Sequence, residues 1–234
     1  MPTLDHQVSA VSSTIARWTS TIVVGILFCT QASSSQLTVQ LPDDRWVEIY
    51  YPILDGVAAC ANLPELYSST LSVPSRRLRI WLPSYSIPAA MVDLRLTDGT
   101  VQGTWYWWWE TNDAKLVRSV RRLVRHEYNC STIVRCEGYE YCVQNFRSPP
   151  QWSPMVAALE LNDVWTLPDE STMPKTNIII FDGTSIIVEA RTDQTYRSYY
   201  YHEPADRPWP EEKKAAAMMD AIYSLYRVST GKQK

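Results

Sequence analysis

Residues 177–191 read NIIIFDGTSIIVEAR, two β-branched runs separated by Asp182-Gly183. An Asp-Gly pair between two such runs is the strongest short-range signal of a β-hairpin, because a type I′ turn needs positive φ at both central residues. A second turn at Asp193-Gln194 leads into the tyrosine-rich run 196–202. The stretch therefore predicts a three-strand antiparallel meander.

A C-terminal helix is expected to cover this meander. Pro210 lies in its first turn, and the two glutamates that follow suit the positive end of a helix dipole. The apolar residues recur at three- and four-residue steps and form one stripe, made of Ala215, Met218, Met219, Ile222, Leu225 and Tyr226. Residues 176–228 are thus predicted to form a sheet-plus-helix layer that closes the core.

The rest of the chain favours a single α+β domain over residues 36–234. Alternating or β-branched runs predict strands at 37–41, 46–51, 76–82, 92–96 and 101–109, with a second hairpin turn at Asp98-Gly99. Helices are expected at 113–128, capped by Thr111 or Asn112, and at 153–161. We predict antiparallel β-sheet meanders packed against about three helices, the last of which covers the last sheet.

The run 76–82 alternates along its length. Arg77, Arg79 and Trp81 fall on one side, and aliphatic residues fall on the other. Alternation of this kind is typical of a strand with one face on the core.

Composition excludes several classes of protein. The net charge of −3 argues against a nucleic-acid binder, which is usually basic. The chain contains neither GxGxxG nor GxxxxGK[ST], so nucleotide loops of those kinds are excluded, and no cofactor is expected. The 10 tryptophans and 14 tyrosines against 3 phenylalanines favour half-buried β surfaces or a binding face.

Residues 1–35 have the character of an export signal. The apolar run 22–29 is short for a membrane span but suits a signal h-region, and small residues precede a cleavage point near Ala32. Two alternatives remain: an uncleaved signal anchor, or a true start downstream of Met1. We expect a periplasmic or secreted protein, with membrane contact only where the signal is uncleaved.

Cysteine number supports export. Removal of the signal takes Cys29 and leaves four cysteines, an even number, as expected in an oxidising compartment. We predict two disulfides among Cys60, Cys130, Cys136 and Cys142, with three pairings open. The chain has no CxxC pair, so the spacing of its cysteines does not match the usual zinc-binding patterns. We therefore predict no metal site.

The run Trp105-Tyr106-Trp107-Trp108-Trp109 is the most unusual stretch of the chain. On a strand, Trp105, Trp107 and Trp109 share one face, and Tyr106 and Trp108 point the other way. One interpretation is that both faces are packed inside the protein. The other is a stacking platform for a sugar, a peptide or a partner protein.

The helix predicted at 113–128 is basic. Its cationic side chains are Lys115, Arg118, Arg121, Arg122 and Arg125, opposite an apolar stripe. A basic amphipathic helix can bind a membrane surface or an acidic partner. The alternative is the solvated face of a packed helix.

No catalytic motif is present, and we predict no catalytic residue with a set role. If both predicted turns of the C-terminal meander are tight, Glu189, Arg191, Tyr196, Ser198 and Tyr200 share one face of the sheet. Carboxylate, guanidinium and phenol groups placed this way can bind a polar ligand or perform acid–base chemistry. The alternative is a solvent-facing ladder of cross-strand polar pairs.

Turn and strand motifs recur in the last third of the chain. They are Val164-Trp165-x-Leu167-Pro168-Asp169, Phe181-Asp182-Gly183-Thr184-Ser185 and Val188-Glu189-Ala190-Arg191, followed by Tyr196, Pro204 and the final helix. Residues 163–228 resemble in these motifs a group of uncharacterised exported bacterial proteins. Where those proteins carry an aromatic residue after the Asp-Gly turn, this chain has Ile186. The resemblance implies an envelope location and no assigned activity.

Three hypotheses about function follow. The first is an exported, non-catalytic protein that binds a protein or other envelope partner, such as an inhibitor, an immunity-like factor or an accessory factor. The second is a small hydrolase or carbohydrate-binding protein that joins Glu189 to the aromatic strand 105–109 in one cleft, with a small polar ligand. The third is an inner-membrane protein anchored by its uncleaved signal.

Overall fold

The structure is a computed structural model of the 234-residue chain. It describes residues 37–41, 44–67, 76–83, 88–147, 149–174 and 184–231, without the side chains of 44–49. Residues 35–234 form one compact unit. The predicted signal 1–35 and the predicted strand 177–181 with its Asp182-Gly183 turn lie outside the described residues.

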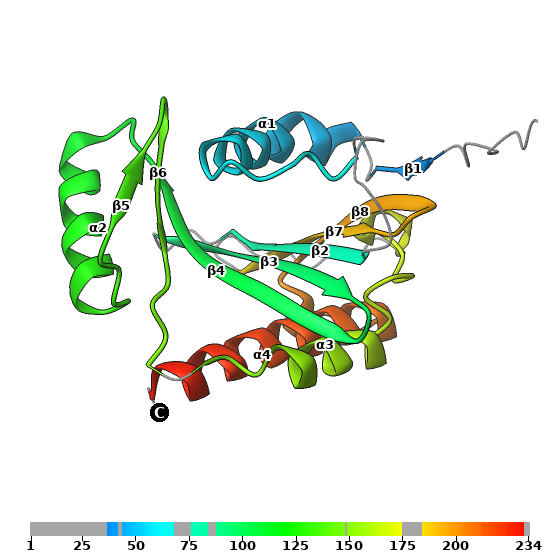
Figure 1. The fold of residues 1–234 in the computed structure, drawn as a ribbon. Coiled ribbons are helices and arrows are strands. Elements are labelled where there is room, and N and C mark those ends of the chain that lie inside the picture. The colour runs from blue at the N-terminus through cyan, green and yellow to red at the C-terminus, as the bar shows by residue number, and fades with distance from the viewer. Residues whose placement is uncertain are drawn as a thin grey trace, which may run out of the picture. The chain divides into compact units, whose positions relative to one another are not determined.

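One sheet runs through this unit. Its strands are β1 (Thr38–Gln40), β2 (Arg76–Leu82), β3 (Ala89–Thr97), β4 (Thr100–Glu110), β5 (Ile133–Arg135), β6 (Tyr139–Val143), β7 (Ser185–Arg191) and β8 (Thr195–His202). Their order across the sheet is β1-β8-β7-β2-β3-β4-β6-β5 (Figure 1). Neighbours are antiparallel except β1 and β8, which are parallel. The α+β class is confirmed in this coarse form. The predicted three-strand meander was wrong, because β7 pairs with β8 on one edge and with β2, from a distant part of the chain, on the edge where the strand 177–181 was expected.

Helices cover both faces of the sheet. They are α1 (Asp44–Cys60), α2 (Ala114–His126), α3 (Trp152–Leu161) and α4 (Pro210–Thr230), with short 3-10 turns at Glu170–Thr172 and Pro204–Asp206. Buried residues of α2, α3 and α4 join one apolar cluster, and those of α1 join a second cluster. Figure 1 shows α1 on the opposite side of the sheet from α3 and α4. We call these sides the α1 face and the α4 face.

Helix α1 replaces the predicted strand at 46–51, and that prediction was wrong. The aromatic and β-branched residues of this run suit a strand locally. From the end of this run onward, however, the buried residues recur at three- and four-residue steps, which is the period of a helix: Tyr51, Leu54, Val57 and Ala58. Burial of this longer stripe against the sheet outweighs local propensity, so the described residues contain one helix more than the three expected.

Strand β2 confirms the predicted boundaries 76–82 but not the single buried face. Leu78 and Ile80 are buried on the α4 face, as expected. On the α1 face, Arg79 and Trp81 are also buried, at 2% and 0% exposure. Alternation in the sequence records polarity and not exposure, so it could not reveal that α1 lies over the polar side.

The sequence predicted the β3–β4 turn correctly but not the N-cap of α2. Asp98 and Gly99 have φ of 46° and 78°, the positive values of a type I′ turn, and they join β3 to β4 in the predicted hairpin. The predicted cap of α2 was wrong by one to two residues. Asp113 is the N-cap, and its carboxylate accepts hydrogen bonds from the backbone N–H groups of Lys115 and Leu116.

The segment after α3 completes the edge of β8. Strand β1 pairs only with residues 195–197 of β8. Farther along, the backbone N–H groups of Tyr200 and His202 donate to the carboxylates of Asp169 and Glu170, at 2.8 and 2.5 Å. Side chains thus replace a neighbouring strand where β1 ends, which leaves these donors satisfied.

Candidate functional site

The predicted group on β7 and β8 does share one face. Glu189 lies opposite Ser198, and Arg191 lies opposite Tyr196, which is the predicted register. Glu189, Arg191, Tyr196 and Tyr200 are all buried on the α1 face. The structure therefore brings these four predicted site residues together, but beneath a helix and not in a solvent-facing ladder.

Hydrogen bonds from the protein occupy both oxygens of Glu189. The indole N–H of Trp81 donates to Oε2 at 2.7 Å, and the hydroxyl of Tyr196 donates to Oε1 at 3.0 Å. Arg79 adds a guanidinium 3.7 Å from Oε2. Burial, reinforced by the charge of Glu189, raises the pKa of Tyr196, so this phenol keeps its proton and remains a donor.

Arg79 continues the cluster toward β3. Its Nε donates to Asp93 at 3.2 Å, and its Nη2 donates to the carbonyl oxygen of Pro64 at 2.9 Å. Arg77 donates to the other carboxylate oxygen of Asp93, also at 2.9 Å. Sequence reasoning missed Arg79, Trp81 and Asp93 as partners of Glu189, although the alternation of 76–82 had placed Arg79 and Trp81 on one side.

The three tryptophans of β4 lie on the other side of the sheet. Trp105, Trp107 and Trp109 are buried in the α4-face cluster, whereas Tyr106 and Trp108 join the cluster beneath α1. The split between faces was predicted correctly. The structure does not join Trp105, Trp107 and Trp109 to Glu189, because the sheet itself separates them.

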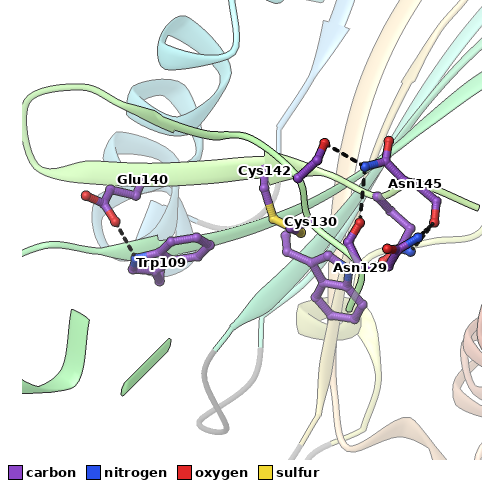
Figure 2. The surroundings of a disulfide bond; sticks show 9 residues. Trp109, Asn129, Cys130, Glu140, Cys142 and Asn145 are labelled. Atoms are coloured by element: carbon purple, nitrogen blue, oxygen red, sulfur yellow. Dashed lines mark hydrogen bonds between the residues drawn. A yellow bond between two sulfur atoms is a disulfide. The ribbon is translucent and has the colours of Figure 1, made fainter. Parts of the chain in front are cut away.

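The four predicted cysteines form two disulfides, Cys60–Cys136 and Cys130–Cys142. The first ties the end of α1 to the turn of the β5–β6 hairpin. The second crosses the base of the same hairpin. Figure 2 shows Cys130–Cys142 beside Asn129 and Asn145, whose amides each donate to the other's backbone carbonyl oxygen, at 2.9 and 3.1 Å. The first bridge therefore ties the hairpin to α1, and the second braces the hairpin itself.

A cationic surface lies next to this hairpin. Arg121 of α2 and Arg135 of β5 both bind Glu140 of β6, whose side chain is 2% exposed (Arg121 by its Nη2, Arg135 by its Nε at 3.1 Å). The indole N–H of Trp109 also donates to Glu140, at 3.1 Å (Figure 2). We call the set Lys115, Arg118, Arg121, Arg122, Arg125 and Arg135 the cationic patch.

Charge in the cationic patch is poorly neutralised. Lys115, Arg118, Arg122 and Arg125 are exposed, and none forms an ion pair with a carboxylate in the described part of the chain. Glu140 pairs with the patch from the sheet, through Arg121 and Arg135, and Asp113 acts on Arg118 from the N-cap of α2. The hydrogen bond with Arg121 holds the pKa of Glu140 below the ordinary value, so Glu140 is ionised at neutral pH.

Two cavities lie elsewhere. One of about 480 Å³ lies between the β3–β4 hairpin and α3, lined in part by the ion-paired Arg76 and Glu160. Another of about 320 Å³ has a polar lining that includes His126, Asn129 and Arg147. Neither cavity is lined by any of the residues predicted to bind a ligand, which are Trp105, Trp107, Trp109, Glu189, Arg191, Tyr196 and Tyr200.

The described residues contain neither a cluster of metal ligands nor a membrane-spanning helix. No group of three histidine, cysteine, aspartate or glutamate side chains there is arranged to hold a metal ion. None of the helices there is both long enough and apolar enough to cross a membrane. No family model, curated protein or solved structure matches the chain.

Proposed function

We propose that the chain is an exported, non-catalytic protein that binds an acidic protein partner through its cationic patch. The observation that carries the proposal is the composition of α2, in which 13 residues hold five cationic side chains and no acidic one, in a chain of net charge −3. Such a local excess steers and orients acidic partners. Both disulfides support an oxidising, extracytoplasmic compartment.

Rigidity of the surroundings adds support. Arg121 and Arg135 are fixed on Glu140, and the hairpin that carries Arg135 is bridged twice. Arginines held in place lose less conformational entropy when they bind, and their planar guanidinium groups match carboxylates. The cationic patch is therefore suited to recognition of a carboxylate-rich surface.

Burial of the alternative site favours binding over hydrolysis. Glu189 is 4% exposed, and its two oxygens accept from Trp81 and Tyr196. A general acid or base must reach its substrate. Trp105, Trp107 and Trp109, which would stack on a sugar in that hypothesis, are buried on the α4 face, on the other side of the sheet from Glu189.

The test is fluorescence anisotropy of a labelled octaglutamate peptide, with octaglutamine as the uncharged probe. We expect binding of octaglutamate that weakens with salt, and a loss of about tenfold in affinity, on the order of 1.4 kcal/mol, in R118E/R122E. The matched control is R95E/K213E, which reverses two exposed cations outside the patch.

Equal weakening by the two double variants, or no binding by the native chain, would contradict the proposal. A parallel measurement uses vesicles of phosphatidylglycerol. Binding to vesicles without binding to the peptide would assign the cationic patch to a membrane surface instead of a protein. Circular dichroism checks that each variant keeps the helix content of the native chain.

A further inference from the structure

We propose that the chain binds a small oxyanion, a carboxylate or a phosphate group, at Arg191 beside Arg77 on the α1 face of the sheet. This site is separate from the cationic patch and does not depend on the proposed function. It rests on the charge balance and the hydrogen bonds of the buried cluster around Glu189.

Charges in the cluster do not balance. Three guanidinium groups lie there, those of Arg77, Arg79 and Arg191, and two buried carboxylates, those of Asp93 and Glu189. The exposed Asp55 of α1 also acts on Arg79, from the surface. Arg79 and Arg191 are at most 4% exposed, and the side chain of Arg77 is 17% exposed. Asp93 is shared by Arg77 and Arg79, and Glu189 lies beside Arg79. Arg191 forms no ion pair among the described residues, and the exposed Asp193 is the carboxylate that acts on its charge.

Two of the three guanidinium nitrogens of Arg191 also lack a hydrogen-bond acceptor among the described residues. Its Nε and Nη1 are buried without a partner in the described part of the chain, and so is Nε of Arg77. The two arginines are direct cross-strand partners on β7 and β2. Like charges placed opposite each other repel, and both groups therefore favour an acceptor between or beside them.

Nearby carboxylates do not fill this role. Asp193, two residues from Arg191, is exposed and forms no ion pair with it. Asp93 already accepts from two arginines. A guanidinium group cannot relieve the cost of burial by losing its proton, so a buried and unpaired arginine is strongly disfavoured.

These groups define the chemistry of the ligand. A guanidinium presents parallel N–H donors that match the two oxygens of a carboxylate or of a phosphate group. One anion would neutralise the surplus charge and accept from the unpartnered donors of Arg191 and Arg77. A free anion and a larger ligand that carries the same group would bind in the same way. The probes below distinguish a carboxylate from a phosphate group.

The test compares thermal unfolding of the full chain in chloride, phosphate and acetate at constant pH and ionic strength. For the native chain we expect a saturable rise in Tm with phosphate, with acetate or with both, on the order of 3–5 °C at a tenfold excess over Kd. A response to phosphate alone indicates a phosphoryl ligand, and a response to acetate indicates a carboxylate ligand.

Variants locate the effect. Arg191→Met removes the charge and keeps an unbranched side chain, so we expect it to fold, to be at least as stable as the native chain in chloride, and to lose the anion response. Arg118→Met removes an exposed arginine of the cationic patch and should keep the response. Arg191→Lys keeps the charge without the paired donors and should respond weakly, and it replaces the methionine variant if that one does not fold.

Three outcomes would overturn the proposal. They are an unchanged Tm of the native chain in all three salts, an equal response of native chain and Arg191→Met, and loss of the response in Arg118→Met alone. The last would place anion binding on the cationic patch. Line broadening of the phosphate signal in phosphorus NMR gives a second readout that does not depend on stability.

Discussion

Glu140 and Glu189 form a natural comparison, because each is a buried carboxylate of the same sheet that accepts an indole N–H from a tryptophan. Trp109 donates to Glu140 at 3.1 Å, and Trp81 donates to Glu189 at 2.7 Å. The two glutamates lie on opposite faces. Glu140 faces the side of α2, and Glu189 faces α1.

Their cations differ in exposure. The side chains of Arg121 and Arg135, which bind Glu140, are 27% and 64% exposed, whereas Arg79 beside Glu189 is 2% exposed. Helix α2 covers Glu140 from the margin of the sheet and leaves Arg121 and Arg135 partly in water. Helix α1 lies across the middle of the sheet and buries Arg79 beside Glu189. The same residue types thus support a surface in one region and an interior in the other.

The largest expected effect is loss of the bridge that joins these two regions. Cys60–Cys136 closes a loop of 76 residues, and Cys130–Cys142 closes one of 12. By loop entropy, removal of the first should cost about 4.5 kcal/mol of unfolding free energy and removal of the second about 3 kcal/mol. Urea unfolding of C60S/C136S and C130S/C142S measures both. The reverse order would show that the hairpin alone, and not its link to α1, governs stability.

Removal of each carboxylate breaks the comparison directly. Glu189→Ala leaves a buried guanidinium, an indole and a phenol without their acceptor, so we expect a cost of about 3–5 kcal/mol. Glu140→Ala frees two arginines that can turn to water, so we expect about 1–3 kcal/mol. Denaturant unfolding gives both values. Equal costs would contradict the difference in enclosure described above.

The smallest expected effect is on the pH dependence of stability. The folded-state pKa of Glu140 lies below its ordinary value of 4.5 because Arg121 binds the ionised form. The unfolded state therefore binds more protons, and this contribution to stability is complete above pH 4.5 and is lost as pH falls through the folded-state pKa. Arg121→Met should reduce the loss of unfolding free energy in acid. If the unfolding free energy of Arg121→Met falls in acid as much as that of the native chain, Glu140 is not the source of that loss.

Local chemistry explains what the sequence could predict. Asp98-Gly99 sets a turn by backbone conformation alone, and a tight turn at Asp193-Gln194 sets the register that places Glu189 opposite Ser198. The stripe of α4 likewise depends only on its own residues. These features involve neighbours in the chain, so their signals are present in short windows of sequence.

The features that the sequence did not predict depend on contacts between residues far apart in the chain. Whether residues 46–51 form a strand or a helix depends on the burial of Leu54 and Val57 against a distant sheet. Neither the pairing of the cysteines nor the choice of Glu140 as the partner of Arg121 has a local signal. The interior position of Trp105 was one of two open interpretations, because a sequence does not state which face of a strand meets water.

Cys60–Cys136 has a mechanical consequence. Residues 61–135, which include β2, β3 and β4, lie inside the loop that this bridge closes. A force applied to the two ends of the oxidised chain passes through the sulfur–sulfur bond, so the backbone of β2, β3 and β4 cannot be extended while this bridge is intact. Reduction releases about 76 residues, roughly 250–270 Å of extended chain, to the pulling force. In oxidising surroundings, therefore, only the parts of the chain before Cys60 and after Cys136 can be drawn out by force.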